Sequence, residues 1–243
     1  MSEKSRLDQL LVARGLCPSR EKAQRAIMAG SVYVEGQKAD KPGRSVAGDA
    51  EVELRGGEKY VGRGGLKLEA ALEHFHIPVQ DRVALDVGAS TGGFTDCLLQ
   101  HGARKVHAID VGHGQIDWRL RNDPRVVVRE GMNARFLTAA DIGEAVELCV
   151  ADVSFISLTL ILPAAFALLT PAADMIVLIK PQFELSPDKV GKGGVVRESQ
   201  YHEEVTSRIR AFVEAAGRQW IGLMPSPIKG REGNTEFLAH LRP

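Results

Sequence analysis

The chain has 243 residues, of which 44% are hydrophobic and 26% are charged, and its formal net charge is zero. This composition is typical of a soluble globular protein, and the length allows one large domain or a medium domain with a small one. A neutral chain has no overall attraction to nucleic acid. The charge is nevertheless uneven, because residues 1–67 hold 13 basic and 9 acidic side chains, whereas residues 68–243 hold 18 and 22. Such an asymmetry is compatible with an N-terminal segment that faces nucleic acid.

Several classes of protein are excluded by short patterns. Cys17, Cys97 and Cys149 are far apart and have no metal-site spacing, so we expect reduced thiols, no disulfide framework and no bound metal. The N-terminus lacks the apolar core of a signal peptide. The longest apolar stretch, residues 158–169, is interrupted by Pro163 and is too short to span a bilayer. The sequence therefore predicts a cytoplasmic protein with no membrane partner.

The first 54 residues predict a small α+β domain. A helical pattern over residues 6–14 ends at Gly15, and Ser19 is placed to cap a second short helix. Apolar runs at 32–34 and 51–54 then predict strands. The predicted boundaries are a small domain over 1–54, a linker over 55–61 and a large domain over 62–243.

In the large domain, short apolar runs alternate with helical patterns. This alternation predicts an α/β fold with a mostly parallel, Rossmann-like sheet that is covered by helices on both faces. The expected strands are 83–87, 106–110, 126–129, 147–152, 174–180, 219–224 and 235–241. The expected helices lie near 93–100, 115–121, 157–169 and 202–216. No helix separates the last two strands, so we expect seven strands with the final pair antiparallel.

A glycine-rich turn follows the first strand, and its Gly-x-x-x-Gly-Gly spacing differs from the Gly-x-Gly-x-x-Gly of dinucleotide sites. NAD presents a pyrophosphate that favours free N–H groups, whereas S-adenosylmethionine carries an ammonium and a sulfonium that favour a nearby acid. Asp86 stands two residues before the first glycine, and Asp110 ends the second strand, where an acid can accept ribose hydroxyls. We therefore favour an S-adenosylmethionine site over a plain turn. The candidate cofactor residues are Asp86, Gly88, Ala89, Ser90, Thr91, Gly92, Gly93, Phe94, Asp110 and Asp152.

Four charged residues are candidates for catalysis. Asp152 and Lys180 end the fourth and fifth strands, at the edge where open parallel sheets bind ligands. Glu236 begins the final strand, whose antiparallel direction returns it to the same edge, and Lys67 lies on the helix that leads into the domain. Transfer of a sulfonium methyl group to a ribose hydroxyl needs a base or an orienting group, and lysine can serve as either. The alternative for each residue is a surface salt bridge.

Other methyl acceptors fit the sequence less well. Methyltransferases acting on exocyclic amines tend to carry Asn/Asp-Pro-Pro-aromatic after the fourth strand, whereas this chain has Asp152-Val153-Ser154-Phe155. Methylation of cytosine carbon needs a nucleophilic cysteine, but Cys97 and Cys149 lie inside a predicted helix and strand.

Five sequence blocks resemble the TlyA (hemolysin A) family, whose large domain is similar to the FtsJ/RrmJ ribose methyltransferases. The blocks are Tyr60-Val61-Gly62-Arg63-Gly64-Gly65-Leu66-Lys67-Leu68, residues 86–96, 151–157, 179–184 and 230–236. The resemblance implies a catalytic tetrad of Lys67, Asp152, Lys180 and Glu236, with S-adenosylmethionine as donor. It also implies cytidine 2′-O-methylation of ribosomal RNA, and an N-terminal domain like the RNA-binding domain named after the fourth small-subunit ribosomal protein.

Basic residues of the small domain are candidates for RNA phosphate contacts. They are Arg6, Arg14, Arg20, Lys22 and Arg25. A solvated helix face is the alternative from charge alone, and the resemblance favours RNA. Residues 186–198 are rich in glycine and basic side chains and predict either a basic lid or an ordinary loop.

Two rival functions follow from the same sequence. The chain could be a ribosome-associated RNA-binding protein that has lost catalysis, or a membrane-lytic protein as the hemolysin label suggests. The intact tetrad favours catalysis over the first, and the lack of a lytic amphipathic segment disfavours the second. The modified nucleotide, the ribosomal subunit and the oligomeric state are left open.

Overall fold

The computed structural model describes residues 4–54 and 59–243. The chain divides into two compact units, one ending at Lys59 and the other beginning at Tyr60. Residues 55–58 of the predicted linker lie outside the described residues. Tyr60, which the sequence analysis placed in the linker, is buried in the core of the large unit.

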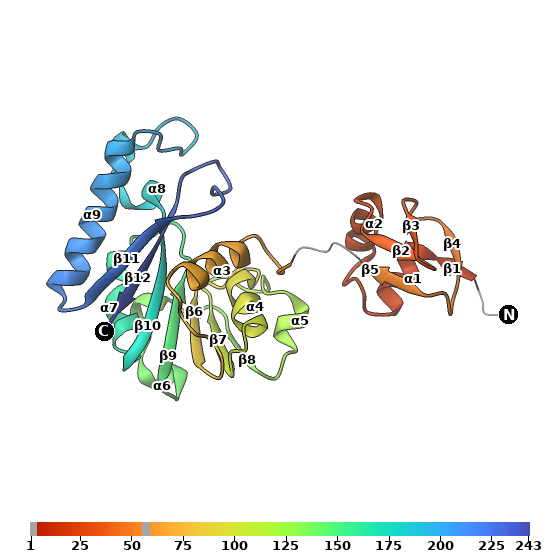
Figure 1. Cartoon of the computed structure of the whole chain (residues 1–243), viewed down its shortest axis with the longest axis horizontal. Helices are drawn as coiled ribbons and strands as arrows, with labels where there is room; N and C mark the ends of the chain where they lie inside the picture. The colour runs from red at the N-terminus through yellow and green to blue at the C-terminus, as the bar shows by residue number, and fades with distance from the viewer. Residues whose placement is uncertain (1–3, 55–58) are drawn as a thin grey trace. The chain divides into compact units, whose positions relative to one another are not determined.

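Over its described residues, the small unit contains two helices and two small antiparallel sheets (Figure 1). Its elements are β1 (Lys4–Arg6), α1 (Leu7–Ala13), α2 (Arg20–Met28), β2 (Val32–Val34), β3 (Gln37–Ala39), β4 (Ser45–Ala47) and β5 (Val52–Leu54). The strand β2 lies between β3 and β5, and β1 pairs with β4. Leu7, Leu11 and Ile27 from the helices pack with Val32 from β2 in one core. The predicted α+β character is confirmed.

Local signals explain where the second helix begins and ends. Ser19 has an extended backbone, and its hydroxyl accepts a hydrogen bond from the backbone N–H of Lys22 at 3.3 Å. Gly30 follows the helix with a φ of 74°, which a residue without a Cβ adopts at low cost. The three short strands β1, β3 and β4 were not expected from the sequence.

The large unit is built around a seven-stranded sheet in the order β11-β12-β10-β9-β6-β7-β8. Its strands are β6 (Val83–Val87), β7 (Lys105–Ile109), β8 (Val126–Arg129), β9 (Val146–Ala151), β10 (Leu169–Ile179), β11 (Gln219–Pro225) and β12 (Phe237–Arg242). Strands β6 to β10 are parallel. Strand β12 is antiparallel to β11, as predicted, and it is inserted between β11 and β10. The predicted α/β, Rossmann-like class is confirmed.

Helices cover both faces of this sheet (Figure 1). They are α3 (Gly64–His74), α4 (Gly93–Gln100), α5 (Trp118–Arg121), α6 (Ala139–Ile142), α7 (Leu162–Phe166), α8 (Pro181–Glu184) and α9 (Ser199–Ala215). Successive residues of β6 point to opposite faces, so that Ala84 packs in the core with α3 and α4, whereas Leu85 packs in the core with α7 and α9.

The predicted helix over 157–169 is wrong as a single element. The chain forms a 3₁₀ helix over Leu158–Leu160 and then the short α7, which has Pro163 in its first turn. Proline cannot donate the backbone hydrogen bond that would join the two helices, and it fits at the start of a new one. Strand β10 then begins at Leu169, whereas the sequence analysis predicted that it begins at residue 174.

A buried charge cluster ties the sheet together toward the amino ends of its parallel strands. Asp174 accepts hydrogen bonds from Arg82 at 2.7 Å, from His240 at 2.9 Å and from Arg242 at 2.8 Å. Burial by itself would raise the pKa of this carboxyl, but the three donors outweigh it and hold the pKa well below its usual range. Asp174 thereby connects β10 to β12 and to the residue before β6.

Replacing the acid of this cluster should destabilise the fold. Asp174→Ala leaves two arginines beside a buried site without their acceptor, and we expect a loss of about 3–5 kcal/mol in the free energy of unfolding. Urea denaturation measures this loss. The control Glu214→Ala removes an exposed pair with Arg210 and should change stability by only about 0.5 kcal/mol. Equal losses in the two variants would contradict the role given to Asp174.

Candidate active site

The glycine-rich turn after β6 brings the backbone of Gly88 close to the backbone that follows β9. Gly88 has a φ of 85°, and a Cβ at this position would lie 2.4 Å from the carbonyl oxygen of Asp152. The N–H groups of Gly88 and Ala89 both donate to the carbonyl of Ile109 at the end of β7. The ends of β6, β7 and β9 therefore meet at a position where a side chain does not fit.

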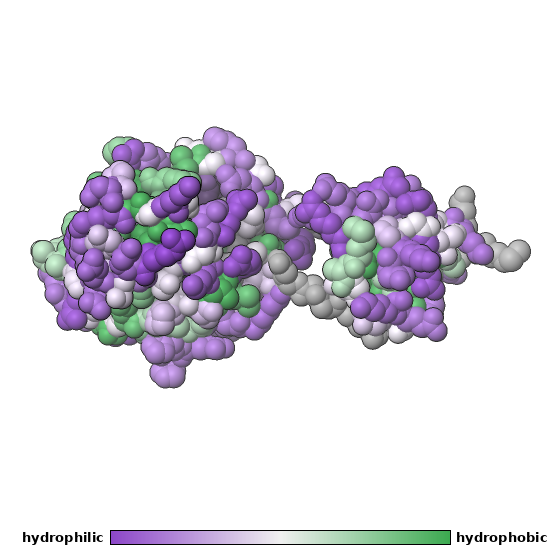
Figure 2. Space-filling view, turned by 90° about the horizontal axis from the view of Figure 1, so that it is seen from above, coloured by the Kyte–Doolittle hydropathy of each residue, from purple (hydrophilic) through white to green (hydrophobic). Residues whose placement is uncertain are grey.

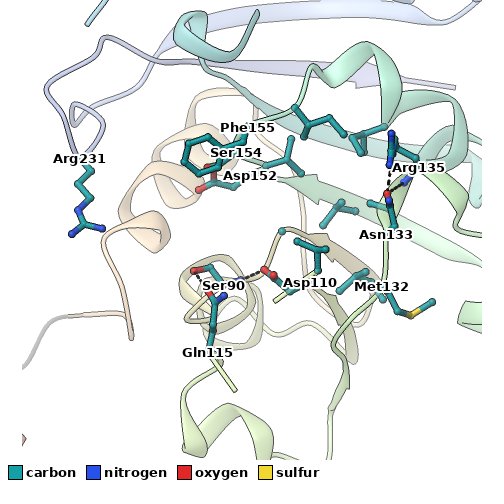
Figure 3. A pocket seen from close by; sticks show the side chains of 18 residues that line it. Ser90, Asp110, Gln115, Met132, Asn133, Arg135, Asp152, Ser154, Phe155 and Arg231 are labelled. Atoms are coloured by element: carbon teal, nitrogen blue, oxygen red, sulfur yellow. Dashed lines mark hydrogen bonds between the residues drawn. The ribbon is translucent and has the colours of Figure 1, made fainter. Parts of the chain in front are cut away.

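Asp110 holds this turn from the neighbouring strand. Its carboxylate accepts hydrogen bonds from the N–H groups of Ser90 and Gly112, both at 2.7 Å. Ser90 in turn donates through its hydroxyl to Gln115 at 3.2 Å (Figure 3). The carboxylate is therefore fixed in place at the carboxyl edge of the sheet.

A cavity of about 580 Å³ opens beside this turn. Of the residues predicted to bind a cofactor, Gly88, Ser90, Asp110 and Asp152 line it. Figure 3 shows the side chains of the last three. The sequence analysis missed the rest of its wall, which is Val87, Ile109, Val111, Gln115, Met132, Asn133, Ala134, Arg135, Val153, Ser154, Phe155, Ile156, Ile161 and Arg231. Residues 132–135 follow β8, which the sequence predicts as a strand over 126–129. Because ligands bind at the carboxyl ends of parallel strands, this position could have marked them as candidate ligand-binding residues.

A smaller cavity of about 200 Å³ adjoins the first. Its walls include the predicted residues Ala89, Thr91, Gly93, Phe94 and Lys180. The two cavities share a set of four lining residues, which are Gly88, Ser90, Asp152 and Ser154. The shared set marks where a ligand in the large cavity would meet one in the small cavity.

The structure places the four candidate catalytic residues in two ion pairs. Lys180 Nζ lies 2.5 Å from Asp152 Oδ1, and Lys67 Nζ lies 2.5 Å from Glu236 Oε2. Lys67 and Glu236 are 8% and 3% exposed, which is unusual for charged side chains. Gly64, at the start of the helix that carries Lys67, lies beside Asp152, since a Cβ there would be 3.9 Å from Asp152 Oδ2. Both pairs thus lie at the carboxyl edge of the sheet.

Two of the predicted cofactor residues line neither cavity. A Cβ at Gly92 would lie 2.2 Å from the side chain of Leu120, so this glycine permits close packing before α4. Asp86 is fully buried, and its Oδ2 accepts a hydrogen bond from the Thr95 hydroxyl at 2.6 Å. Burial, with a smaller contribution from the charge of Asp152, raises the pKa of Asp86 to about 7.

An exposed aromatic ring stands at the mouth of the large cavity. Phe155 is 90% exposed and has a φ of 62°, a left-handed conformation that is rare for a bulky residue. Its ring centroid lies 4.8 Å from that of Phe183. Figure 3 shows Phe155 next to Ser154 and Asp152. Figure 2 shows patches of hydrophobic surface among hydrophilic residues on the large unit.

The loop over residues 186–198 is held in place by Asn234. This buried side chain donates to the carbonyl of Gly194 at 2.8 Å and accepts from the N–H of Val196 at 2.9 Å. Lys189 pairs with Glu204 of α9 at 2.7 Å. The loop is therefore attached to the turn that precedes Glu236.

The cysteines do not show the features of a nucleophile. Cys97 and Cys149 are completely buried, and burial raises the pKa of the Cys149 thiol far above its usual range. Among residues 4–54 and 59–243, no group of three His, Cys, Asp or Glu side chains is placed to hold a metal ion. Within those same ranges, no helix combines the length and apolar character needed to cross a membrane.

In the small unit, most of the predicted RNA-binding residues also make internal contacts. Asp8 is completely buried and accepts hydrogen bonds from Arg6 and Arg20, each at 3.0 Å. Arg14 donates to the backbone carbonyls of Gly48 and Ala50. The remaining two residues lie on α2, where Arg25 pairs with Glu21 and the N–H of Lys22 bonds to Ser19.

Comparisons with known proteins agree with this architecture. Residues 60–243 match the family described as FtsJ-like methyltransferase, and residues 5–52 match the S4 domain. The chain is 51% identical to the "Putative rRNA methyltransferase YqxC" of Bacillus subtilis, over 99% of this chain and 86% of that protein. It is 45% identical to the "16S/23S rRNA (cytidine-2'-O)-methyltransferase TlyA" of Mycobacterium tuberculosis, over 100% of this chain and 91% of that protein. A solved structure titled "Putative hemolysin from Streptococcus thermophilus" has 46% identity and a TM-score of 0.74, over 100% of this chain and 89% of that one.

The raised pKa of Asp86 makes stability depend on pH. Between about pH 4 and pH 7 the folded protein holds a proton that the unfolded chain releases, so stability falls as the pH rises through this interval. Asp86→Asn removes this titration and keeps an oxygen that can accept from Thr95. The variant should gain stability over the wild type at pH 8, by up to about 4 kcal/mol, and the gain should shrink toward pH 4.

Urea denaturation at pH 5 and pH 8 measures this difference. Asp123→Asn, which alters a partly buried carboxylate paired with Arg125, is the control. The interpretation fails if the stability difference between Asp86→Asn and the wild type is the same at both pH values.

Proposed function

The chain belongs to the FtsJ-like methyltransferase family and carries an S4 domain, and on this basis we propose that it transfers a methyl group from S-adenosylmethionine to the 2′-hydroxyl of a cytidine in ribosomal RNA. The resemblance predicted from five sequence blocks is confirmed by the match over residues 60–243 and by whole-chain relatives such as the rRNA (cytidine-2'-O)-methyltransferase of Mycobacterium tuberculosis. The observation that carries the proposal is the pair of lysine–carboxylate contacts beside an acid-lined cavity. With ribosomal RNA as its substrate, we expect the protein to act in the cytoplasm.

The large cavity fits S-adenosylmethionine. Its volume of about 580 Å³ is in the range of small-molecule sites, and the backbone of Gly88 forms part of its wall. Asp110 would accept the ribose hydroxyls, and residues 132–134 would contact the adenine. The turn over residues 88–93 and Asp152 would hold the methionine part, whose positive charges favour a carboxylate.

The residues of the chain can perform the transfer without a covalent intermediate. When bound, the sulfonium supplies a methyl group to O2′, and the transfer releases S-adenosylhomocysteine and the hydroxyl proton. Lys180 lines the small cavity, so it would contact the target hydroxyl and receive its proton. Asp152 would hold the amine of Lys180, and the buried Lys67–Glu236 pair would stabilise charge on the oxygen.

Two features support an RNA substrate. The S4 domain match covers the small unit, whose α2 carries Arg20, Lys22 and Arg25. Phe155 presents an aromatic face next to Asp152, and proteins that read unstacked RNA bases use such rings for stacking. An RNA-binding protein without catalysis would need the S4 domain but not the two lysine–carboxylate ion pairs of the large unit. The ion pairs therefore favour an enzyme over a binding protein.

Loss of Lys180 should abolish turnover. Isolated small and large ribosomal subunits, incubated with methyl-labelled donor, should gain label with the wild type, and Lys180→Ala should lower the rate by about 10²–10⁴-fold. Arg210→Ala, which removes an exposed ion pair with Glu214 on α9, is the control. Mapping of the labelled nucleotide identifies the target. Label that persists with Lys180→Ala would contradict the mechanism, and no label with the wild type would favour the non-catalytic alternative.

Loss of the Asp110 charge should weaken cofactor binding. Asp110→Asn replaces a carboxylate oxygen by an N–H group that faces backbone donors, and we expect the Kd for S-adenosylmethionine to rise at least about tenfold. Isothermal titration calorimetry measures the Kd, and Asp123→Asn, at a residue that lines neither cavity, serves again as the control. An unchanged Kd would show that the cofactor does not use Asp110.

A further inference from the structure

Phe155 presents its ring to solvent from a backbone conformation that phenylalanine rarely adopts. The residue is almost fully exposed, and its φ of 62° lies in the left-handed region. Both features cost free energy, because an apolar ring in water and a strained backbone each favour another conformation. The residues around Phe155 therefore have to hold it in this position.

The chain just beyond Phe155 is anchored in the core. Leu158 is buried in the core that contains α7 and α9, and the side chain of Ile156 packs against the same core. This packing takes the backbone N–H of Leu158 out of water, so that this group needs an acceptor within the protein. The acceptor has to lie within a few residues of the exposed ring.

Glu184, the last residue of α8, supplies that acceptor. Its side chain is only 2% exposed, and its carboxylate accepts hydrogen bonds from the N–H of Leu158 at 2.8 Å and from the Ser157 hydroxyl at 2.7 Å. Arg208 of α9 donates to the same carboxylate at 3.3 Å and also to the backbone carbonyl of Glu184. The buried charge therefore has a counter-charge, and the segment after β9 is tied to two helices.

The same short helix also supports the ring itself. Phe183 precedes Glu184 in α8, and its ring centroid lies 4.8 Å from that of Phe155, with 49° between the ring planes. Pro181 begins this helix directly after Lys180, and its fixed φ suits that position. One element thus contacts both the Phe155 ring and the backbone that follows it.

We propose that Glu184 is a positioning residue that holds the Phe155 ring outward to stack on a base of the RNA substrate, an inference that rests on the function proposed above. A ring that is already in its bound orientation binds a base more tightly, because binding then does not have to order the segment. Without the carboxylate, the buried N–H of Leu158 would lose its acceptor. The segment would then relax, and the ring could turn away from the substrate.

Glu184 acts at a distance from the reacting groups. It is buried and lines neither cavity, so it contacts neither the cofactor nor the RNA. Asp152 is fixed independently of it, since the Asp152 N–H donates to the carbonyl of Val87 at 2.9 Å. Loss of Glu184 should therefore weaken the use of RNA and leave cofactor binding unchanged.

Kinetics with ribosomal subunits and methyl-labelled donor, below the Tm of each variant, test the proposal. Phe155→Ala should lower kcat/KM for RNA roughly 10–100-fold, because it removes the stacking surface. Glu184→Ala should lower it at least about fivefold, while the Kd for S-adenosylmethionine stays within about twofold of the wild type. Glu184→Gln keeps an oxygen that can accept from Leu158 and should recover most of kcat/KM.

A control separates positioning from a general loss of stability. Asp174→Asn weakens another buried carboxylate network, at the amino edge of the sheet. It should lower Tm and leave kcat/KM for RNA within about twofold of the wild type. If Glu184→Ala does not fold, Ser157→Ala replaces it, since it removes one of the two hydrogen bonds and should lower kcat/KM about threefold.

A double-mutant cycle completes the test. If Glu184 acts through the ring, then adding Glu184→Ala or Ser157→Ala to Phe155→Ala should lower kcat/KM further by less than about twofold. Losses that multiply in the double variant, an unchanged kcat/KM in either single variant, or an equal loss of cofactor affinity would overturn the inference and leave the proposed function intact. An inactive wild type would instead remove the proposed function itself.

Discussion

The insertion of β12 between β10 and β11 determines where the charged residues of the site can meet. Because β12 runs antiparallel to β10, with Phe237 opposite Ile179, the residue before β12 comes back to the edge at which β10 ends. Lys180 follows Ile179 and Glu236 precedes Phe237, so the two charged residues lie next to the same strand pair, although 56 positions separate them in the chain. Without that reversal, Glu236 would lie at the far edge of the sheet and Lys67 would be buried without a counter-charge. A charge buried in this way is too costly to keep.

Much of this arrangement could be predicted from the sequence, since it follows from periodicity and chain direction. Apolar runs located the seven strands, and the rule that ligands bind at carboxyl ends brought Asp152 and Lys180 to one edge. The three-residue strands β1, β3 and β4 could not be predicted, because a segment such as Lys4–Arg6 carries no apolar alternation and pairs only through tertiary contacts. Residues 132–135, which line the large cavity, match no sequence motif. They reach the cavity because they follow β8, whose carboxyl end lies at that edge of the sheet.

Two predicted cofactor residues show a different limit of sequence reasoning. An acid and a glycine in a binding motif look alike from the sequence whether they touch a ligand or support the backbone that does. Asp86 bonds to Thr95 under the turn, and Gly92 makes room for Leu120. Ser154 presents the opposite case, because a serine two residues after an acid has no distinctive pattern, and only the position of Lys180 makes it notable.

The buried charged groups at the two edges of the sheet differ in how many hydrogen-bond partners they have. At the amino edge, Asp174 has three donors and its hydrogen-bonding capacity is largely used, which suits a structural tie between strands. At the carboxyl edge, the lysines keep positions without a protein partner among the described residues. Unused hydrogen-bonding capacity costs stability, and proteins tolerate that cost where a substrate is going to use it.

The attachment made by Asn234 has a consequence for anyone who recombines this enzyme with its relatives. The loop over residues 186–198 and the turn before Glu236 are distant in sequence, yet the side chain of Asn234, which belongs to the turn, makes two hydrogen bonds to the loop backbone. A chimera that exchanges the loop alone would place another protein's loop backbone opposite the Asn234 side chain, which makes its hydrogen bonds to Gly194 and Val196 of the native loop. A workable crossover has to carry position 234 along with the loop, so that these two stretches are inherited as one block.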